Sequence, residues 1–387
     1  MPTGLDRLAR DPHLQDLLRG RRFALLAHPA SVTRGFVHVS DVLAALSLRP
    51  ELILGPEHGY GGEAQDMIGV LDARDARGVR VRSLYGESTE DLSPRAEDLE
   101  GLDLVVVDLQ DVGARYYTFV WTALLVLRAC HARGVRLIVL DRPNPIGHTL
   151  VEGRLQDAAF RSFVGLEPVP VRHALTLGEI LAHRAAIERL SDALSIVVGE
   201  REVPATFVMP SPNMPTLDTA LVYPGGCLLE GTNLSDGRGT TRPFEITGAP
   251  WLDGRRLAEG LAATGLAGFV ARPLTFSPTF HKHARQTCGG VQIHVTDPHA
   301  FRPYATYLAL VALAHHHHPA DFRFRTERYE FVDDIPAFDL LTGSAAARTR
   351  ILAGDDPSEV ARALAHVGEE ERSIVEHARV EGARRAA

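Results

Sequence analysis

The stretch DLVVVDL (residues 103–109), followed by TFVWTALLVLRACHAR (118–133) and RLIVL (136–140), decides the fold of this chain. The first and last of these runs consist mainly of valine, isoleucine and leucine, which is typical of strands buried on both faces. The segment between them has the length and the pattern of a helix. A strand, a helix and a second strand in this order predict a right-handed crossover between parallel strands.

The same alternation continues on both sides of this unit. Strands are predicted at 23–26, 52–54 and 79–84, and a helix is predicted around 39–48. Thr176 and Glu179 have the spacing of a capping box and predict the start of another helix. We therefore expect an α/β fold with a doubly wound, Rossmann-like parallel sheet.

The pattern changes in the second half of the chain. Residues 204–250 are rich in Pro, Gly, Asn and Thr and have few periodic segments, so we expect an ordered loop that forms part of a site. Beyond it, helices and strands of a smaller α+β domain are predicted at 253–263, 268–271, 291–295 and 300–317, before a helical C-terminal region. We expect a Rossmann-like catalytic domain over 1–245 and a smaller auxiliary α+β domain over 246–387.

Composition limits the classes of partner. The 387 residues are 45% hydrophobic and 23% charged, as in a soluble globular protein, and the net charge of −8 argues against binding to nucleic acid or to an anionic membrane surface. The N-terminal ten residues lack the apolar stretch of a secretory signal, and no apolar run approaches the roughly 20 residues that span a bilayer. We expect a cytoplasmic protein from the chain as given, with an exported form open if the true start differs. The oligomeric state is open.

Neither a metal nor a cofactor is predicted. The cysteines Cys130, Cys227 and Cys288 are odd in number and far apart, which favours buried free thiols over disulfides or a zinc site. The run of four histidines at 315–318 ends an apolar helix, where histidines interact well with the helix dipole. The chain has no H-E-x-x-H motif and no G-x-S-x-G nucleophile elbow.

Three polar clusters follow directly after predicted strands. They are GPEHGYGG (55–62), DLQDVGARYY (108–117) and DRPNP (141–145). Singly, each is explained by a turn, a cap or a rigid proline segment. Because ligands of open parallel sheets bind beyond the carboxyl ends of the strands, the coincidence of all three predicts a site at this edge.

These clusters belong to a longer set of ordered motifs. The chain resembles the NamZ-like exo-β-N-acetylmuramidase family over nearly its whole length. The resemblance lies in GPEHG (55–59), DLQDVGARYYT (108–118), LDRPNP (140–145), PSPNMP (210–215), YPG (223–225), EGTNLSDGRGTTRPF (230–244), PTFHKH (278–283) and FDLLTG (338–343).

The resemblance implies a Rossmann-like domain, a smaller C-terminal domain and an active-site cleft between them. It also implies release of N-acetylmuramic acid from the non-reducing end of peptidoglycan fragments, so muramyl sugars are the expected partners. The glutamate of GPEHG, Glu57, is the residue carried over as catalytic. Many members carry an export signal that this chain lacks. The loop YGGEAQDMIGV (60–70) also differs from the arginine-bearing loop of other members, which leaves the precise sugar open.

A glycosidase needs a proton donor for the leaving oxygen and stabilisation of an oxocarbenium-like centre. We expect Glu57 to be the general acid and His58 to orient it or the sugar. The second component is open: Asp111 or Asp108 could activate water, or the acetamido group of the substrate could attack the anomeric carbon.

The lactyl carboxylate of muramic acid calls for a cation. Arginine suits it because a guanidinium can bind a carboxylate through two hydrogen bonds. The candidates are Arg115, Arg142 and Arg238. The remaining residues that we expect to contact substrate are Asp108, Gln110, Tyr116, Asn144, Asn213, Glu230, Asn233 and Lys282.

Two other functions fit the same residues. A metal-assisted phosphoester or amide hydrolase would use Asp108, Asp111 and Asp141 at the strand ends, and chelation would abolish its activity. A non-catalytic protein that binds muramyl sugars would show saturable binding without product.

Overall fold

The computed structural model describes residues 3–65, 67–69, 71–202 and 206–386. Its first half is built on a seven-stranded sheet with the order β3-β4-β2-β1-β5-β6-β7. Every neighbouring pair is parallel except β3 with β4. The strands are β1 (Phe23–Ala27), β2 (Leu52–Gly55), β3 (Ala73–Arg74), β4 (Arg80–Ser83), β5 (Leu104–Asp108), β6 (Arg136–Leu140) and β7 (Leu194–Val197). The predicted α/β fold is confirmed.

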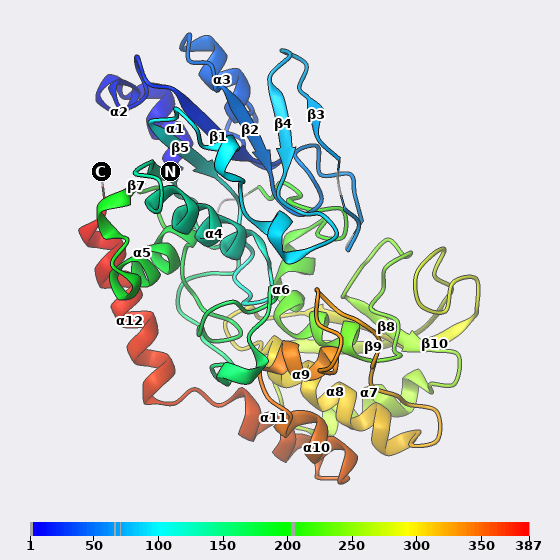
Figure 1. The fold of residues 1–387 in the computed structure, drawn as a ribbon. Helices are drawn as coiled ribbons and strands as arrows, with labels where there is room; N and C mark the ends of the chain where they lie inside the picture. Colours follow the sequence, from blue (N-terminus) through cyan, green and yellow to red (C-terminus); the bar gives the residue numbers. More distant parts are fainter. Residues whose placement is uncertain (1–2, 66, 70, 203–205, 387) are drawn as a thin grey trace.

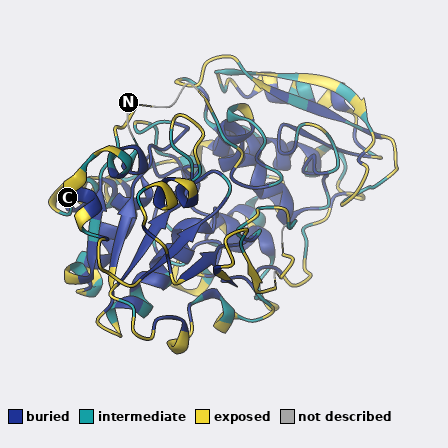
Figure 2. Ribbon diagram, turned by 90° about the horizontal axis from the view of Figure 1, so that it is seen from above, coloured by how far each residue is buried: buried dark blue, intermediate teal, exposed yellow. Residues whose placement is uncertain are grey.

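Both faces of the central strands of this sheet are buried, as the continuous apolar runs predict, whereas the edge strand β3 is exposed. In β5, Val105 and Val107 pack into one apolar core, and Leu104 and Val106 pack into a second core on the opposite face. Helices α4 (Phe119–His131) and α5 (Leu177–Glu188) contribute to the first core, whereas α1 (Gly4–Arg10), α2 (Pro12–Asp16) and α3 (Val39–Ala45) contribute to the second. Figure 2 shows the strands as a buried layer.

The second half contains a smaller antiparallel sheet with the order β8-β10-β9. Helix α8 is apolar on all sides and is buried from Pro303 to Ala314, because α6, α7, α10 and α11 surround it. The elements are α6 (Leu217–Gly226), β8 (Ile246–Ala249), α7 (Gly254–Ala263), β9 (Phe269–Phe276), β10 (Cys288–Val295), α8 (Pro303–His317), α9 (Ala337–Thr342), α10 (Ala346–Leu352) and α11 (Pro357–Ala365).

The last helix, α12 (Glu369–Arg384), returns to the first half and packs against α5. Figure 1 shows α12 in red along α5. At its end, Ala386 forms a parallel bridge with Ile196 of β7. The domain boundary predicted between residues 245 and 246 stays a prediction. Two helices pack across it: α6 precedes the boundary but packs on α8, and α12 follows it but packs on α5.

Several elements differ from the sequence-based expectation, among them α1, α2 and β3, which were not predicted. The segment 204–250, expected to be irregular, contains α6 and the whole of β8; its residues 204 and 205 lie outside the described residues. Strand β7 was not predicted. Short 3-10 helices lie at Thr89–Leu92, Ala96–Asp98, Ala158–Phe160, Ser191–Ala193 and Cys227–Gly231. Within the described residues, no helix is both long enough and apolar enough to span a membrane.

Candidate active site

Glu57 lies two residues beyond the end of β2, where the chain turns sharply. The backbone N–H of Gly59 donates to the carbonyl oxygen of Pro56 at 2.9 Å, and His58 has a left-handed backbone with φ of 68°. A Cβ at Gly55 would lie 2.7 Å from the backbone nitrogen of Tyr60, so the turn requires glycine there. The turn buries the Glu57 side chain, which is 5% exposed.

The carboxylate of Glu57 is held from the next polar cluster. The hydroxyl of Thr118 donates to its Oε2 at 2.6 Å. Thr118 precedes the first residue of α4 and does not cap that helix with its side chain. Its hydroxyl instead fixes the carboxylate of Glu57. This hydrogen bond brings the segment after β2 into contact with the segment after β5.

Glu57 lines a narrow pocket of about 40 Å³, and the other lining residues come from both halves of the chain. Six residues expected to act in catalysis or binding line it: Glu57, His58, Tyr116, Asn213, Glu230 and Arg238. The other lining residues are Tyr117, Thr118, Val164, Ser211, Met214, Tyr223, Phe244, Tyr329 and Glu330.

One wall of this pocket is aromatic. The rings of Tyr223 and Phe244 lie edge to face at 4.9 Å between centroids, and Tyr117 contacts both Tyr223 and Phe119. The hydroxyl of Tyr116 donates to the carbonyl oxygen of Pro224. Burial raises the pKa of Tyr116, Tyr117 and Tyr223 well above its usual range, so these phenols stay neutral.

A second wall is charged. Arg238 donates to Glu230 at 2.7 Å, forms an ion pair with Asp236 at 3.1 Å and lies over the ring of Phe244. The hydroxyl of Tyr329 donates to the other oxygen of Glu230 at 2.6 Å. Burial acts to raise the pKa of Asp236, but the charges of Arg238 and Lys282 outweigh it and hold that pKa well below its usual range. Asp236 is therefore an anion, and its ion pair with Arg238 helps to hold that guanidinium in place.

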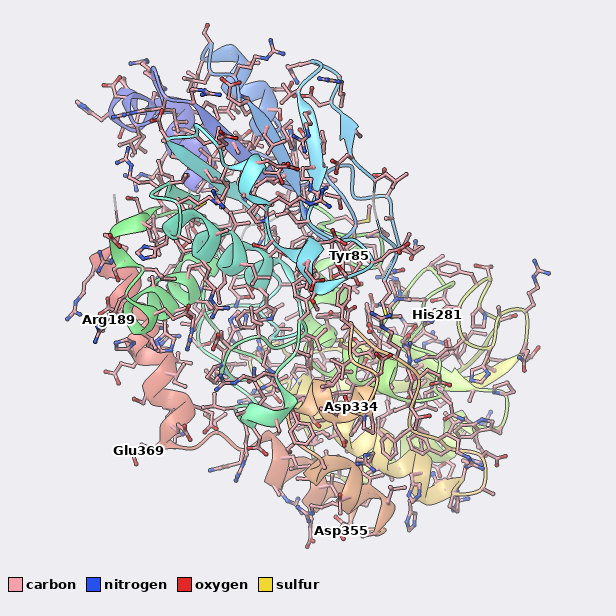
Figure 3. All side chains as sticks on the ribbon, in the orientation of Figure 1. Tyr85, Arg189, His281, Asp334, Asp355 and Glu369 are labelled. Carbon is pink, nitrogen blue, oxygen red and sulfur yellow. The ribbon has the colours of Figure 1, made fainter. Side chains whose placement is uncertain are left out.

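Glu330 completes the pocket from a strained position, with φ of 46°. The hydroxyl of Tyr85 donates to its Oε2 at 3.1 Å. Tyr85 comes from the first half of the chain and His281 from the second, and Figure 3 labels both on the side where the two halves face each other. None of the sequence motifs indicated Tyr85, Tyr329 or Glu330 as site residues.

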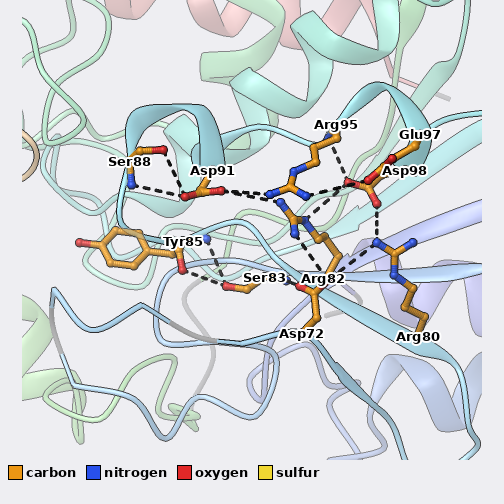
Figure 4. Close-up of polar contacts among 10 residues, drawn as sticks. All are labelled: Asp72, Arg80, Arg82, Ser83, Tyr85, Ser88, Asp91, Arg95, Glu97 and Asp98. Atoms are coloured by element: carbon orange, nitrogen blue, oxygen red, sulfur yellow. Dashed lines mark hydrogen bonds and ion pairs between the residues drawn. The ribbon is translucent and has the colours of Figure 1, made fainter.

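A network of hydrogen bonds and ion pairs holds the segment that carries Tyr85 (Figure 4). The hydroxyl of Ser83 donates to the carbonyl oxygen of Tyr85 at 3.1 Å and accepts from its N–H at 3.2 Å. Arg80 and Arg82 both pair with the buried Asp98, at 3.0 and 3.6 Å. The loop after β4 is thus anchored to the sheet edge near the pocket.

Several predicted residues lie outside the pocket and have structural partners. Arg142 donates to both oxygens of Asp108, at 2.5 and 2.9 Å, in a buried ion pair. Arg115 donates to three carbonyl oxygens, those of Arg154 at 2.8 Å, Val169 at 3.2 Å and Leu341 at 2.9 Å. These two guanidinium groups are committed to holding the protein together.

Asp111 also faces inward. Its Oδ2 accepts from the N–H of Gly113 at 2.8 Å and lies 3.4 Å from Nε2 of His173. The amide of Gln110 donates to the carbonyl oxygens of Asp111 and Pro143. Asn144 donates to the carbonyl oxygen of Leu175 and accepts from the N–H of Ile146, which fixes the loop after β6.

Asn233 and Lys282 line a different cavity. The Asn233 amide donates to the carbonyl oxygen of Asp321 and accepts from the N–H of Arg323, both at 2.9 Å. The ammonium of Lys282 donates to the carbonyl oxygen of Leu229 at 2.7 Å and lies 3.5 Å from Asp236.

The three polar clusters that follow strands do not all come from neighbouring strands. The clusters after β5 and β6 come from adjacent strands, but β1 lies between β2 and β5. His28, just after β1, fills that gap: its Nε2 accepts from the backbone N–H of Gln110 at 2.9 Å. Burial lowers the pKa of His28 well below its usual range, so its imidazole is neutral.

Potential metal ligands do not gather in the described part of the chain, where no group of three or more His, Cys, Asp or Glu is placed to hold a metal ion. Residues His315–His317 form the last turn of α8, as expected. All three cysteines are buried free thiols, also as expected. In the loop 60–70, Asp66 and Val70 lie outside the described residues.

Comparison with known proteins identifies the family. The family model described as exo-beta-N-acetylmuramidase NamZ, N-terminal, matches residues 23–218, and its C-terminal counterpart matches residues 221–376. The peptidoglycan beta-N-acetylmuramidase NamZ of Bacillus subtilis (strain 168) is 37% identical over 361 residues, which cover 90% of this chain and 84% of that protein.

Solved structures agree with the fold. One crystal structure of a DUF1343 family protein from Bacteroides fragilis NCTC 9343 has a TM-score of 0.83 at 26% identity and covers 99% of this chain and 97% of its own. A second protein of that family from the same organism has a TM-score of 0.71 at 25% identity, with coverage of 100% and 98%. With two family models spanning most of its length and a relative at 37% identity, this chain belongs to the NamZ family of exo-β-N-acetylmuramidases.

Proposed function

We propose that this protein is an exo-acting β-N-acetylmuramidase that releases N-acetylmuramic acid from the non-reducing end of peptidoglycan fragments. Its relative in B. subtilis is a peptidoglycan beta-N-acetylmuramidase. The observation that carries the proposal is the placement of Glu57: a buried carboxyl, fixed by Thr118, in a pocket lined by both halves of the chain.

Glu57 is the proton donor in the proposed reaction. It transfers its proton to the glycosidic oxygen while the bond to the anomeric carbon breaks. The Thr118 hydroxyl holds one carboxyl oxygen, so the other is directed to the substrate. His58 is fixed by the contact of its Nδ1 with the carbonyl oxygen of Ala64 at 2.8 Å, which suits an orienting role.

The second component is best supplied by the substrate itself. Both oxygens of Asp108 are bound by Arg142, and Asp111 does not line the pocket. We therefore favour attack of the acetamido oxygen on the anomeric carbon, with Glu330 accepting a hydrogen bond from the acetamido N–H. Water then attacks the anomeric carbon and opens the cyclic intermediate. The Glu57 carboxylate accepts a proton from that water. Two displacements at one carbon predict retention of the anomeric configuration.

Arg238 is the cation proposed for the lactyl carboxylate. Of the three arginines expected from the sequence, it is the one that lines the pocket. Asp236 and Glu230 hold its guanidinium in place, and the ring of Phe244 supports it from one face. A pre-organised guanidinium is suited to recognising a carboxylate through two hydrogen bonds.

The replacement Glu57→Gln tests the assignment directly. It removes the proton but keeps the size of the side chain, so we expect kcat on a chromogenic N-acetylmuraminide to fall by about 10²–10⁴-fold. Circular dichroism and the melting temperature should match those of the wild type. A variant that keeps more than half of the wild-type rate would exclude Glu57 as the proton donor.

The anomer of the released sugar tests the second component. Wild-type protein is incubated with a disaccharide that carries muramic acid at its non-reducing end, and the product is followed by NMR from the first minutes. We expect the β-anomer first. An initial α-anomer would show inversion and would return a protein carboxylate to the role of base. Addition of EDTA should leave the rate unchanged, whereas a metal-assisted hydrolase would lose its activity.

A further inference from the structure

A second cavity, of about 590 Å³, lies beside the pocket that contains Glu57. It is formed by loops of the second half of the chain together with Met67, which also lines another cavity together with Glu330. Its walls are Met67, Thr232, Asn233, His281, Lys282, His283, Arg323, Phe324, Arg325 and Glu327. We refer to it as the basic cavity.

The charge of the basic cavity is opposite to that of the whole protein. Lys282, Arg323 and Arg325 line it against a single carboxylate, Glu327, which gives 3 − 1 = +2 with the histidines neutral. The whole chain carries −8. A concave surface that gathers positive charge on an acidic protein raises the local concentration of anions.

The basic cavity is coupled to the Glu57 pocket through a shared wall. The guanidinium of Arg325 lies over the ring of Tyr329 at 5.3 Å, and the hydroxyl of Tyr329 donates to Glu230 inside the pocket. On the other side, Lys282 pairs with Asp236, which pairs with Arg238 of the pocket. A substrate that reaches from one space into the other would contact both sides of this wall.

The loop that brings Lys282 to the cavity is strained. His281, His283 and Arg285 all have left-handed backbones, with φ of 67°, 55° and 65°. Such a backbone is unfavourable for a residue with a side chain and persists when its surroundings fix it, most often at binding and catalytic sites. Here His283 is fixed by a contact of 2.7 Å between its Nε2 and the carbonyl oxygen of Asn233.

Lys282 is the only lysine in the sequence. The chain has 41 lysines and arginines, so 41 − 1 = 40 of them are arginines. A chain that uses arginine at every other cationic position has a specific use for an ammonium at this one. A guanidinium is planar and bulky, whereas an ammonium is a compact charge whose three donors can point in different directions.

We propose that the basic cavity is a subsite on the leaving-group side of the scissile bond, and that it binds a carboxylate of the glycan. This inference rests on the proposed function. In the proposed function, Arg238 binds the carboxylate of the terminal sugar in the Glu57 pocket. The cations of the basic cavity are therefore available for a second carboxylate. That carboxylate belongs either to the lactyl group of the next muramic acid or to a peptide attached to it.

Three substrates separate these sources. All carry an unmodified muramic acid at the non-reducing end, so the same bond is cleaved. The first is the disaccharide, whose leaving group is uncharged. The second is the tetrasaccharide, whose leaving group carries one lactyl carboxylate. The third is the tetrasaccharide with a stem peptide on its internal muramic acid. The wild type should show a higher kcat/KM on one of the two longer substrates than on the disaccharide.

The variant Arg325→Gln removes one cation of the cavity. We expect kcat/KM on the preferred longer substrate to fall about tenfold, as for the loss of one charge-assisted hydrogen bond, with less than a twofold change on the disaccharide. The advantage of the longer substrate should also shrink as salt is raised from about 0.05 to 0.5 M.

Arg285→Gln is the matched control. Arg285 lies in the same loop and carries the same charge but does not line the cavity, so this variant should treat all three substrates as the wild type does. Equal losses on the disaccharide and the tetrasaccharides in Arg325→Gln would overturn the proposal, because the cavity would then serve the terminal sugar. Equal kcat/KM of the wild type on all three substrates would overturn it as well. If the wild type cleaves none of them, the proposed function itself fails.

Discussion

Three arginines, Arg115, Arg142 and Arg238, lie in sequence motifs and are candidates for binding the lactyl carboxylate. Their partners in the structure give them different roles. Arg115 is enclosed by backbone carbonyls, Arg142 is paired with Asp108, and Arg238 lines the pocket. The sequence identifies all three as candidates for one role because a guanidinium that binds a ligand and one that fastens loops have the same chemistry. Only the surroundings of each side chain distinguish them.

The partners of Arg115 predict its effect on stability. Arg115→Gln would leave at least two buried carbonyl oxygens without a donor, each at a cost of about 1–3 kcal/mol. We expect the free energy of unfolding, measured by chemical denaturation, to fall by about 3 kcal/mol. KM of the folded variant should stay at the wild-type value. The exposed Arg161 is the control, since Arg161→Gln should change stability by less than about 0.5 kcal/mol. A large rise in KM with unchanged stability would restore Arg115 as a substrate contact.

Thr118 offers a sharper test of how Glu57 is positioned. Thr118→Val keeps the shape of the side chain but removes the hydroxyl that donates to Glu57. We expect kcat to fall about tenfold with little change in KM, because the carboxyl loses its fixed orientation. Thr118→Ser, which keeps a hydroxyl, should recover most of the rate. Equal rates for the Val variant and the wild type would mean that the bond does not position the acid.

At the scale of elements, hydrophobic runs predicted the central strands and most of the helices. Strand β5 and helix α4 lie within one or two residues of their predicted bounds, because β5 is buried on both faces and all its residues except the last, Asp108, are apolar. Strand β7 has only four residues and one of them, Ser195, is polar, so it gave too weak a signal. Helix α6 was missed because Pro224, Gly225 and Gly226 lie within it and normally end a helix.

We expect the contact between α5 and α12 to weaken as the pH falls. Nδ1 of His183 on α5 lies 2.8 Å from Nδ1 of His377 on α12. Burial, with smaller effects from His377 and Arg184, lowers the pKa of His183 to about 4. An unfolded histidine takes up a proton near pH 6.5. The folded state therefore gains full stability from neutral His183 above pH 6.5 and loses it as the pH falls from 6.5 towards 4.

Hydrogen exchange measures this effect locally. Between pH 7 and pH 5, after correction for intrinsic rates, the amides of α12 should lose protection before those of α4. His183→Gln should remove that difference. The overall melting temperature is a poorer measure, because burial raises the pKa of Asp141 to about 6 and this acid favours the folded state as the pH falls. If α12 and α4 lost protection together in the wild type, the histidine pair would not control the contact.

At the scale of the whole molecule, the pocket is closed by segments far apart in the sequence. Glu57 and Thr118 follow strands of the large sheet, whereas Glu230, Tyr329 and Glu330 come from the second half of the chain. The strand-end rule predicted Glu57 but not Thr118, which lies ten residues beyond the end of β5. The facing wall depends on how the two halves dock, and no motif spacing encodes that arrangement.

The path of α12 predicts how the molecule unfolds. This helix follows α11, which packs on α8, and then returns to α5 and the edge of the large sheet. Because it fastens the second half of the chain to the first, we expect calorimetry of the full chain to show one cooperative transition. Deleting residues 369–387 exposes the face of α5 and removes the tie, so the transition should move to lower temperature and split into two. Val375→Ala, which trims a buried contact of α12 but keeps the helix, should lower the melting temperature and keep a single transition. Two transitions in the full chain would show that the halves fold independently and that α12 does not couple them.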